Sequence, residues 1–338
     1  MTLKSILSRS PVDPYLLLLI ATVGVAFVLP AEGAAAHVAN LVVDGAVALL
    51  FFLYGARLAP EAIVAGMGHW RLQLMVFAST YVLFPLIGLA LHGVLRGRIE
   101  PDIATGLLYL CLLPSTVQSS IAFTAIARGN VAAAVCSASM SNLLGVFITP
   151  ALVALMLPVA SGGFSLHALE GIAGQILLPF ALGQGARRWI SGWLGRHPVL
   201  TSTVDRGSVL LVVYAAFSEG MATHIWSKVS AGDLGLILAI DLVILGLVIA
   251  ATTLASRRLG FAAEDEIAIV FCGSKKSLAG GVPMATILFA GHAVSLIVLP
   301  LMLFHQTQLF VCATLARRYA RRGAAPEPAE PALAPARA

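Results

Sequence analysis

The stretch Gly273-Ser274-Lys275-Lys276-Ser277 lies inside a run of mostly apolar residues that extends from Ile267 to Ala290. A lysine at the centre of a bilayer costs from about 2.5 kcal/mol on insertion scales to more than about 10 kcal/mol in simulations, so such residues usually face a cavity or a partner. Neighbouring helical residues point about 100° apart, so both lysines face one cavity only where the helix is broken or the cavity is wide. The stretch therefore predicts a functional site, with snorkelling or a carboxylate partner as the alternative for one lysine.

The composition is typical of a membrane protein. Of 338 residues, 59% are hydrophobic and 11% are charged, whereas a soluble domain has roughly 25% charged residues. The net charge of +5 comes from basic residues scattered between apolar segments, which favours loops that meet anionic lipid rather than nucleic acid. We expect an all-α integral membrane protein in a lipid bilayer, with no nucleic-acid partner.

Apolar runs of membrane-spanning length recur along the chain and predict ten transmembrane helices. Two halves of five helices enter the membrane in opposite senses, which is the geometry of an inverted repeat. We expect a cytoplasmic N-terminal segment at 1–13, a first five-helix repeat at 14–157, a second inverted repeat at 158–316, and a basic, then Ala/Pro-rich disordered cytoplasmic tail at 317–338. The predicted helices cover residues 14–30, 37–55, 70–93, 102–127, 131–157, 166–187, 205–225, 233–256, 265–290 and 293–315.

Basic residues are distributed unequally between the two sides of this topology. With a cytoplasmic N-terminus, fifteen Lys and Arg residues fall inside, and Arg96, Arg98 and Lys228 fall outside. Cytoplasmic loops carry the excess of basic residues, so we expect both termini in the cytoplasm. No cleavable signal or targeting segment is recognisable, which favours a bacterial inner membrane.

The fourth predicted helix of each half is interrupted by polar residues. The first interruption is Leu113-Pro114-Ser115-Thr116-Val117-Gln118-Ser119-Ser120, and the second is the lysine stretch. Proline and glycine free backbone groups that need partners in the absence of water, and the N-terminus of each half-helix favours an anion. Paired interruptions at corresponding positions point to the binding site of a transporter.

Polar side chains near the interruptions are the candidate substrate- or ion-binding residues. Ser137 and Ser141 share a face of the fifth helix, although small residues there could equally allow close helix packing. His305 is a candidate for proton coupling, with a packing role as the alternative. Carboxylates that could pair with a lysine are Asp44, Glu219 and Asp241. The candidate set from the residues themselves is Ser115, Thr116, Gln118, Ser119, Ser120, Ser137, Ser141, Asn142, Ser274, Lys275, Lys276, Ser277, His305 and Gln306.

Cysteine spacing and missing motifs argue against an enzyme or a metal centre. Cys111, Cys136, Cys272 and Cys312 lie within apolar runs without metal-ligand spacing, so we expect buried residues. The sequence contains no HExxH, GxSxG or P-loop motif. We expect no enzymatic activity and no organic cofactor.

Two segments resemble the bile acid:sodium symporter family. The run from Pro114 to Pro150, with its Ala127-Arg128-Gly129-Asn130 turn, is similar to the segment joining helices four and five of that family. Phe271-Cys272-Gly273-Ser274-Lys275-Lys276-Ser277-Leu278 and Phe289-Ala290-Gly291-His292 resemble its cotransporter 7 branch. The resemblance covers about residues 16–315. It implies a panel domain of helices one, two, six and seven and a core domain of helices three to five and eight to ten. In that fold, discontinuous helices four and nine cross at the membrane centre beside two sodium ions.

The resemblance also assigns the family's sodium ligands to positions in this chain. The serine and asparagine of helix four fall on Ser119 and Ser120, and the glutamine of helix three falls on Thr80. The hydroxyl ligands of helix five fall on Ala134 and Ala138, with Ser137 one register away. A sodium ion would therefore lie near Ser119, Ser120 and Ser274, with Thr80 joining the candidate set.

Helix nine departs from the family pattern. The acidic ligand falls near Val270, the glutamine falls near Ser274, and lysines stand about one turn further on. A sodium site without its carboxylate loses its charge balance. A lysine ammonium carries three donors that could hold the crossing backbone instead. Our main mechanistic hypothesis is that a built-in cation replaces one or both sodium ions.

The sequence thus predicts a secondary active transporter of a small organic anion that works by alternating access, as a monomer or a homodimer. The missing carboxylate argues against sodium coupling. The alternative is a non-transporting membrane regulator or sensor that keeps the transporter fold.

Overall fold

The computed structural model describes residues 14–57, 69–95, 97–157, 172–222, 224, 227 and 229–322. All regular structure within these ranges is helical, which confirms the all-α class. Six helices of the described part are long and apolar enough to cross a membrane, and shorter apolar helices accompany them. Together with the composition, they make the chain a multi-pass membrane protein. The helices are α2 (Pro14–Val28), α3 (Ala34–Arg57), α5 (Trp70–Ala78), the π-helix η2 (Ser79–Leu83), α6 (Phe84–Leu95), α7 (Pro101–Leu112), α8 (Gln118–Ile126), α9 (Val131–Met156), the π-helix η3 (Ile172–Leu177), α11 (Leu178–Arg196), α12 (Pro198–Ala222), α13 (Ala231–Arg258), α14 (Ala263–Gly273), α15 (Leu278–Leu288) and α16 (Val294–Arg322).

Most predicted spans agree with these helices, but the sixth and seventh are displaced. The sixth was predicted at 166–187, whereas α11 continues to Arg196, and the seventh was predicted at 205–225, whereas α12 begins at Pro198. The polar residues between these spans lowered the local hydropathy without stopping the helices. The break falls at His197, because proline is favoured in the first turn of the next helix.

The predicted tail also begins later than expected. α16 continues through 317–322, where the sequence predicted the start of the tail. Arginine near a helix C-terminus is favourable for the helix dipole, so the basic run extends the helix. The predicted segment 1–13 and the remainder of the tail lie outside the described residues.

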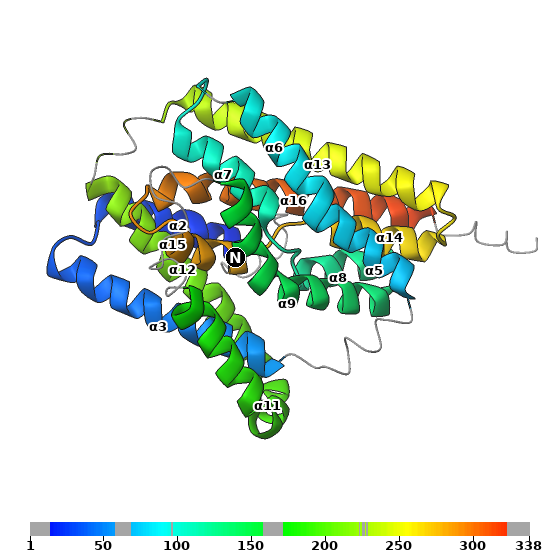
Figure 1. Ribbon diagram of the computed structural model, residues 1–338, viewed down its shortest axis with the longest axis horizontal. Helices are drawn as coiled ribbons and strands as arrows, with labels where there is room; N and C mark the ends of the chain where they lie inside the picture. Colours follow the sequence, from blue (N-terminus) through cyan, green and yellow to red (C-terminus); the bar gives the residue numbers. More distant parts are fainter. Residues whose placement is uncertain are drawn as a thin grey trace, which may run out of the picture.

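The helices form two groups. In the first group, α3 packs against α11 and α12, and α12 packs against α2. Gly55 of α3 and Gly183 of α11 allow these two helices to approach closely. A Cβ atom at Gly55 would collide with the Phe180 carbonyl, and one at Gly183 would collide with the Phe52 carbonyl. Figure 1 shows α3 and α11 toward the lower left of the molecule and α13 along its upper edge.

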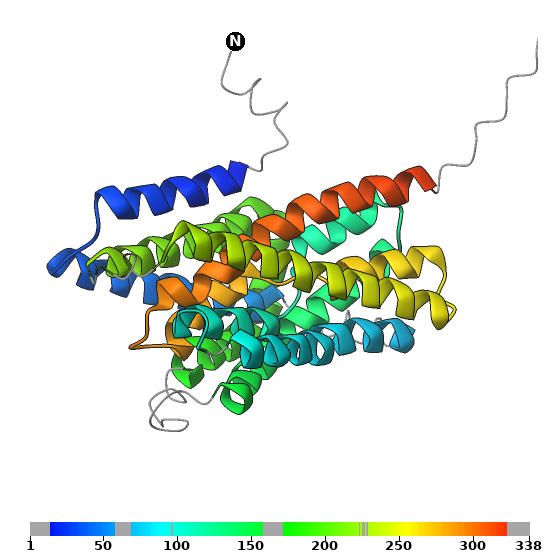
Figure 2. The ribbon, with the colours of Figure 1, turned by 90° about the horizontal axis from the view of Figure 1, so that it is seen from above.

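The second group contains α5 to α9 and α13 to α16. α7 packs against α6 and α16, and α14 contacts α5, α8, α9 and α13. Gly106 of α7 lies so close to α16 that a Cβ atom there would collide with the carbonyl of Ile297. Seen from above, α16 runs alongside α13, and its C-terminal end lies on the same side as the α13–α14 turn (Figure 2).

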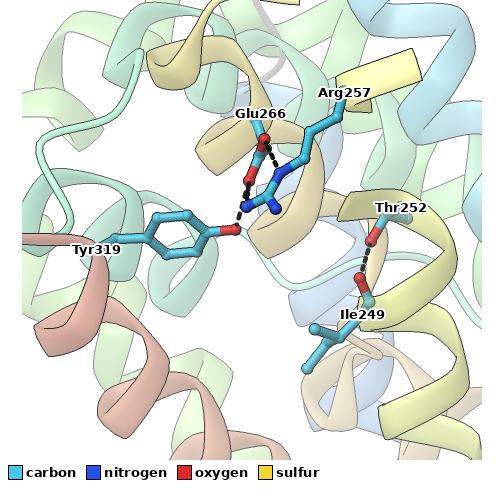
Figure 3. Close-up of polar contacts among 5 residues, drawn as sticks. All are labelled: Ile249, Thr252, Arg257, Glu266 and Tyr319. Carbon is cyan, nitrogen blue, oxygen red and sulfur yellow. Dashed lines mark hydrogen bonds and ion pairs between the residues drawn. The ribbon is translucent and has the colours of Figure 1, made fainter. Parts of the chain in front are cut away.

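Polar contacts tie one end of the second group together. Arg257 at the end of α13 donates two hydrogen bonds to Glu266 of α14, at 2.9 and 3.0 Å, and Tyr319 of α16 donates to the same carboxylate at 2.9 Å (Figure 3). The Asn130 amide in the α8–α9 turn donates to Asp265 at 2.8 Å, and its backbone N–H donates to Glu264 O at 2.9 Å. These contacts join α9, α13, α14 and α16 at this end of the group.

Candidate functional site

Two helices of the second group are broken, and the breaks lie against each other. α7 ends at Leu112 and α8 begins at Gln118, while α14 ends at Gly273 and α15 begins at Leu278. The Ser277 backbone N–H donates to the Pro114 carbonyl at 2.9 Å. Leu113 has the extended backbone that a following proline favours. The two interruptions predicted from the sequence therefore meet in space.

The Lys276 ammonium supplies donors to the first break. Its Nζ lies 3.0 Å from the Thr80 carbonyl, 3.0 Å from the Cys111 carbonyl and 2.7 Å from the Leu113 carbonyl. It also lies 4.0 Å from the centre of the Phe84 ring, and the residue is fully buried. All three ammonium donors thus find acceptors, two of which are carbonyls at the C-terminal end of α7 that have no helical partner.

Hydroxyl groups of η2, of the first break and of α8 satisfy the second break. Ser120 donates to the Phe271 carbonyl at 3.0 Å, Ser115 donates to the Cys272 carbonyl at 2.6 Å, and Ser79 donates to the Gly273 carbonyl at 2.8 Å. These are the last three carbonyls of α14, and they would otherwise be buried without a donor. Each break therefore completes the hydrogen bonding of the other.

Lys275 has quite different surroundings. Its Nζ lies 4.0 Å from the centre of the Phe123 ring and 5.4 Å from that of Phe271, and the residue is fully buried. Among the described residues, this amine has no hydrogen-bond partner. The rings offer a cation–π contact, which is weaker than the three hydrogen bonds of Lys276.

The alternative that one lysine pairs with a carboxylate finds no support among the described residues. Lys276 bonds to backbone carbonyls, and Asp44 and Glu219 are exposed. Asp241 is fully buried, and neither of its carboxylate oxygens has a hydrogen-bond partner within the ranges described. Backbone acceptors replace carboxylates for Lys276, because the first break leaves carbonyls at the place that its side chain reaches.

A cavity of about 440 Å³ lies beside the two breaks, between the two helix groups. The second group contributes residues at the N-terminal ends of α8 and α15, among them Gln118 and Ser277. Opposite them, the first group contributes a charged cluster. Arg57 lies 3.8 Å from Asp205, and the Arg206 guanidinium lies 5.4 Å from the centre of the Tyr15 ring. Helix N-termini and two arginines give this cavity a positive character.

The predicted site residues divide between the cavity, the junction of the breaks and other positions. Those that line the cavity are Thr116, Gln118, Ser119, Asn142, Ser277 and His305. Those at the junction are Thr80, Ser115, Ser120, Ser141 and Lys276, where Ser141 Oγ accepts from the Ser115 N–H at 3.0 Å. Those buried nearby are Ser137, Ser274 and Lys275. Gln306 is half-buried and belongs to neither the cavity nor the junction, because it points to a different face of α16 from His305.

Sequence reasoning missed several residues of this region. Gln308 was not among the candidates, yet its side chain bonds to both backbone groups of Lys276, at 2.9 and 3.0 Å. Arg57 and Arg206 were counted only among the cytoplasmic basic residues, and Asp205 was only the first residue of the seventh predicted span, although all three line the cavity. The spacing of His305 and Gln308 by three residues, on one face of α16, was the available signal for Gln308.

Comparison with known proteins defines the family. Residues 13–321 match the SBF-like CPA transporter family. The chain belongs to the SBF-like CPA transporter family. This family of transporters is part of the bile acid:sodium symporter superfamily, so the resemblance of the two sequence segments is confirmed. This membership accords with the expectation that the chain is not an enzyme.

Individual relatives of this SBF-like chain cover most of its length. “Uncharacterized protein PA2026” of Pseudomonas aeruginosa is 56% identical over 92% of this chain and 93% of its own. “Putative symporter YfeH” of Escherichia coli K12 is 51% identical, again over 92% of this chain and 93% of its own. “Sodium/bile acid cotransporter 7” of Rattus norvegicus is 30% identical over 80% of each chain.

Proposed function

We propose that this SBF-like protein is a secondary active transporter that carries a small organic anion by alternating access. In this proposal, the first helix group is the panel and the second is the core, and together they form ten spans in two inverted five-helix repeats. The observation that carries the proposal is the cavity between the groups, where the N-terminal ends of α8 and α15 face Arg57 and Arg206. Substrate in this cavity touches both groups, so their relative movement changes the side to which the cavity opens.

The charge of the cavity favours an anion. Helix N-termini carry a partial positive charge, and the backbone N–H groups of their first turn lack helical partners. Two arginines and one aspartate, Arg57, Arg206 and Asp205, line the opposite wall. Leu143, Val146 and Phe180 supply apolar surface to the same cavity. A substrate with one anionic group and an apolar body fits this combination.

We further propose that the Lys276 ammonium takes the structural place of sodium. The carbonyls of Thr80, Cys111 and Leu113 accept hydrogen bonds from its Nζ, so these oxygens are engaged by a cation that belongs to the chain. Val270 stands where the family resemblance puts an acidic ligand, and an apolar side chain cannot balance the charge of a sodium ion. These residues do not fit a sodium site, and transport would not require sodium.

The proposed location is a bacterial inner membrane with both termini in the cytoplasm. The support is the distribution of basic residues. Arg57, Arg128, Arg206, Arg257 and the arginines of 317–322 all lie on the side proposed to be cytoplasmic.

Counterflow in proteoliposomes tests the proposal. Purified full-length protein is reconstituted into liposomes that are loaded with unlabelled taurocholate, benzoate or lactate. Entry of the same labelled anion is then measured with and without sodium and proton gradients. We expect counterflow of at least one anion without sodium. Arg206→Gln should reduce it, because Arg206 lines the cavity, and Arg258→Gln should not, because Arg258 is an exposed residue outside it. No flux of any anion under any gradient would contradict transport and favour the regulator.

A further inference from the structure

We infer that Asp205 binds a proton when the substrate anion enters the cavity, so that each anion crosses the membrane together with one proton. This coupling rests on the proposed transport of an organic anion and adds the ion that drives it. The observation behind it is an ion pair on the cavity wall, between Arg57 of α3 and Asp205 of α12. A substrate anion that reaches the Arg57 guanidinium competes with the Asp205 carboxylate for it.

The ion pair of Arg57 and Asp205 is loose. The Arg57 guanidinium nitrogen lies 3.8 Å from Asp205 Oδ2, which is too far for a hydrogen bond. The other carboxylate oxygen, Oδ1, is buried and has no hydrogen-bond partner among the described residues. The Arg57 side chain is 45% exposed and that of Asp205 is 16% exposed, so water reaches both groups. A carboxylate or sulfonate that accepts two hydrogen bonds from the guanidinium would hold Arg57 better than Asp205 does.

A substrate anion beside Arg57 leaves Asp205 without its counter-ion. Asp205 and Arg57 line one cavity, so the anionic group and the carboxylate compete for one guanidinium in a partly buried site. Like charges at such a site disfavour each other, and one of them takes up a proton. The anionic group keeps its charge because the guanidinium stabilises it, so the Asp205 carboxylate takes the proton from water in the cavity. Proton and anion therefore bind together, and each strengthens the binding of the other.

Among the described residues of the cavity wall, Asp205 and His305 are the groups that change charge between about pH 4 and 8. Arginines stay protonated over this range and tyrosines stay neutral. Arg206 is exposed and carries the same charge whether the cavity is empty or filled. α11 and α15 line the cavity with residues that do not titrate, such as Phe180 and Leu278. The charged and titratable groups that face Asp205 or line its cavity in this part of the chain are Tyr15 of α2, Tyr54 and Arg57 of α3, Arg206 of α12 and His305 of α16.

Exchange of partners at Arg57 keeps the charge of the cavity constant. In the empty cavity, the Asp205 carboxylate balances Arg57. In the filled cavity, the substrate anion balances Arg57, and protonated Asp205 is neutral. An anion without a proton would add one negative charge, which is costly inside a membrane. The empty and the doubly loaded protein therefore change sides, and the anion and the proton leave to water on the far side when Arg57 pairs with Asp205 again.

Net uptake and counterflow separate proton coupling from substrate binding. Asp205→Asn copies the protonated carboxyl, so the loaded protein still changes sides, but the empty protein keeps an unpaired Arg57. With taurocholate, benzoate and lactate as probes in proteoliposomes, we expect counterflow within about threefold of the wild type. Uptake driven by an inward proton gradient should fall at least about tenfold. Asp205→Glu should keep both activities. Asp241→Asn is the matched control, because Asp241 belongs to α13 and does not line the cavity.

A pH indicator inside the liposomes provides a reading on the unaltered protein. An inward taurocholate gradient should acidify the interior with the wild type and not with Asp205→Asn. The sulfonate of taurocholate stays ionised and carries no proton itself, and protein-free liposomes correct for diffusion of benzoic and lactic acid. The KM of the wild type should fall as the pH falls, by at most about tenfold per pH unit for one linked proton. The KM of Asp205→Asn should not depend on pH.

Anion uptake by the wild type without proton entry would overturn the coupling. Proton coupling that persists in Asp205→Asn would also overturn it, and loss of coupling in His305→Gln instead would place the proton on His305. If the wild type exchanges none of the three anions, the proposed function fails and this coupling fails with it. That result is distinct from exchange of an anion without protons, which contradicts the coupling alone.

Discussion

Lys275 and Lys276 are neighbours in the sequence and equally buried, yet their surroundings differ in kind. Lys276 Nζ donates to three carbonyls within 3.0 Å. Lys275 Nζ lies between the rings of Phe123 and Phe271 without a hydrogen-bond partner among the described residues. A buried ammonium costs several kcal/mol, on the order of what three charge-assisted hydrogen bonds return. Burial alone therefore does not define the role of a lysine. The hydrogen-bond acceptors around its amine define that role.

The largest effect should follow from removing the better-bonded amine. Lys276→Met keeps an unbranched side chain of similar length but leaves the carbonyls of Thr80, Cys111 and Leu113 buried without a donor. We expect a loss of about 3–5 kcal/mol of stability, the usual result of removing one partner from a buried charged network. Thermal unfolding of the purified protein in detergent measures it. A variant as stable as the wild type would show that Lys276 does not hold the first break.

A smaller loss should follow from removing one hydroxyl that serves the second break. Ser115→Ala leaves the Cys272 carbonyl without the donor that lies 2.6 Å away, and one buried unsatisfied acceptor costs about 1–3 kcal/mol. Ser119→Ala is the matched control. Ser119 is half-buried on the cavity wall, and its hydroxyl bonds only to Thr116 among the contacts of the described residues. Unfolding midpoints should fall for Ser115→Ala and stay close to wild type for Ser119→Ala. Equal shifts would refute the pairing of the breaks.

Removing the amine of Lys275 should leave the stability of the protein unchanged or increase it, unlike the same change at Lys276. Lys275→Met removes a buried amine that makes no hydrogen bond to the described residues. Methionine sulfur makes favourable contacts with aromatic rings of about 0.3–1.5 kcal/mol. We expect unchanged stability or a gain of about 1 kcal/mol, measured by the same unfolding assay. A loss as large as that of Lys276→Met would mean that the two lysines are held alike, and the comparison would fail.

The sequence predicted the breaks well because a break has a local signature. Proline, glycine and clustered hydroxyls inside an apolar run mark Pro114 to Ser120 and Gly273 to Ser277 without any knowledge of packing. The length of apolar runs placed most helices for the same reason, and it misplaced the sixth and seventh where amphipathic residues continue the helix to Arg196.

The partners of the lysines were beyond the sequence because they are backbone atoms. Every residue has a backbone carbonyl, so the sequence does not mark those of Thr80 and Cys111 as acceptors. Only the fold shows that Lys276 reaches them. The π-helix η2, which includes Thr80, also has no clear signature, although such turns often occur at functional sites. Arg206 was one of fifteen basic residues counted on the cytoplasmic side, and only the position of α12 shows that it lines the cavity.

The central claim is that the Lys276 ammonium fills the structural role of sodium, and the sodium dependence of thermal unfolding tests it most directly. The wild-type protein is unfolded in sodium chloride and in potassium chloride of equal ionic strength. A ligand at 100 times its dissociation constant stabilises the folded state by about 2.7 kcal/mol, so a sodium site would raise the midpoint visibly. We predict equal midpoints in the two salts. A midpoint that rises with sodium and not with potassium would contradict the account.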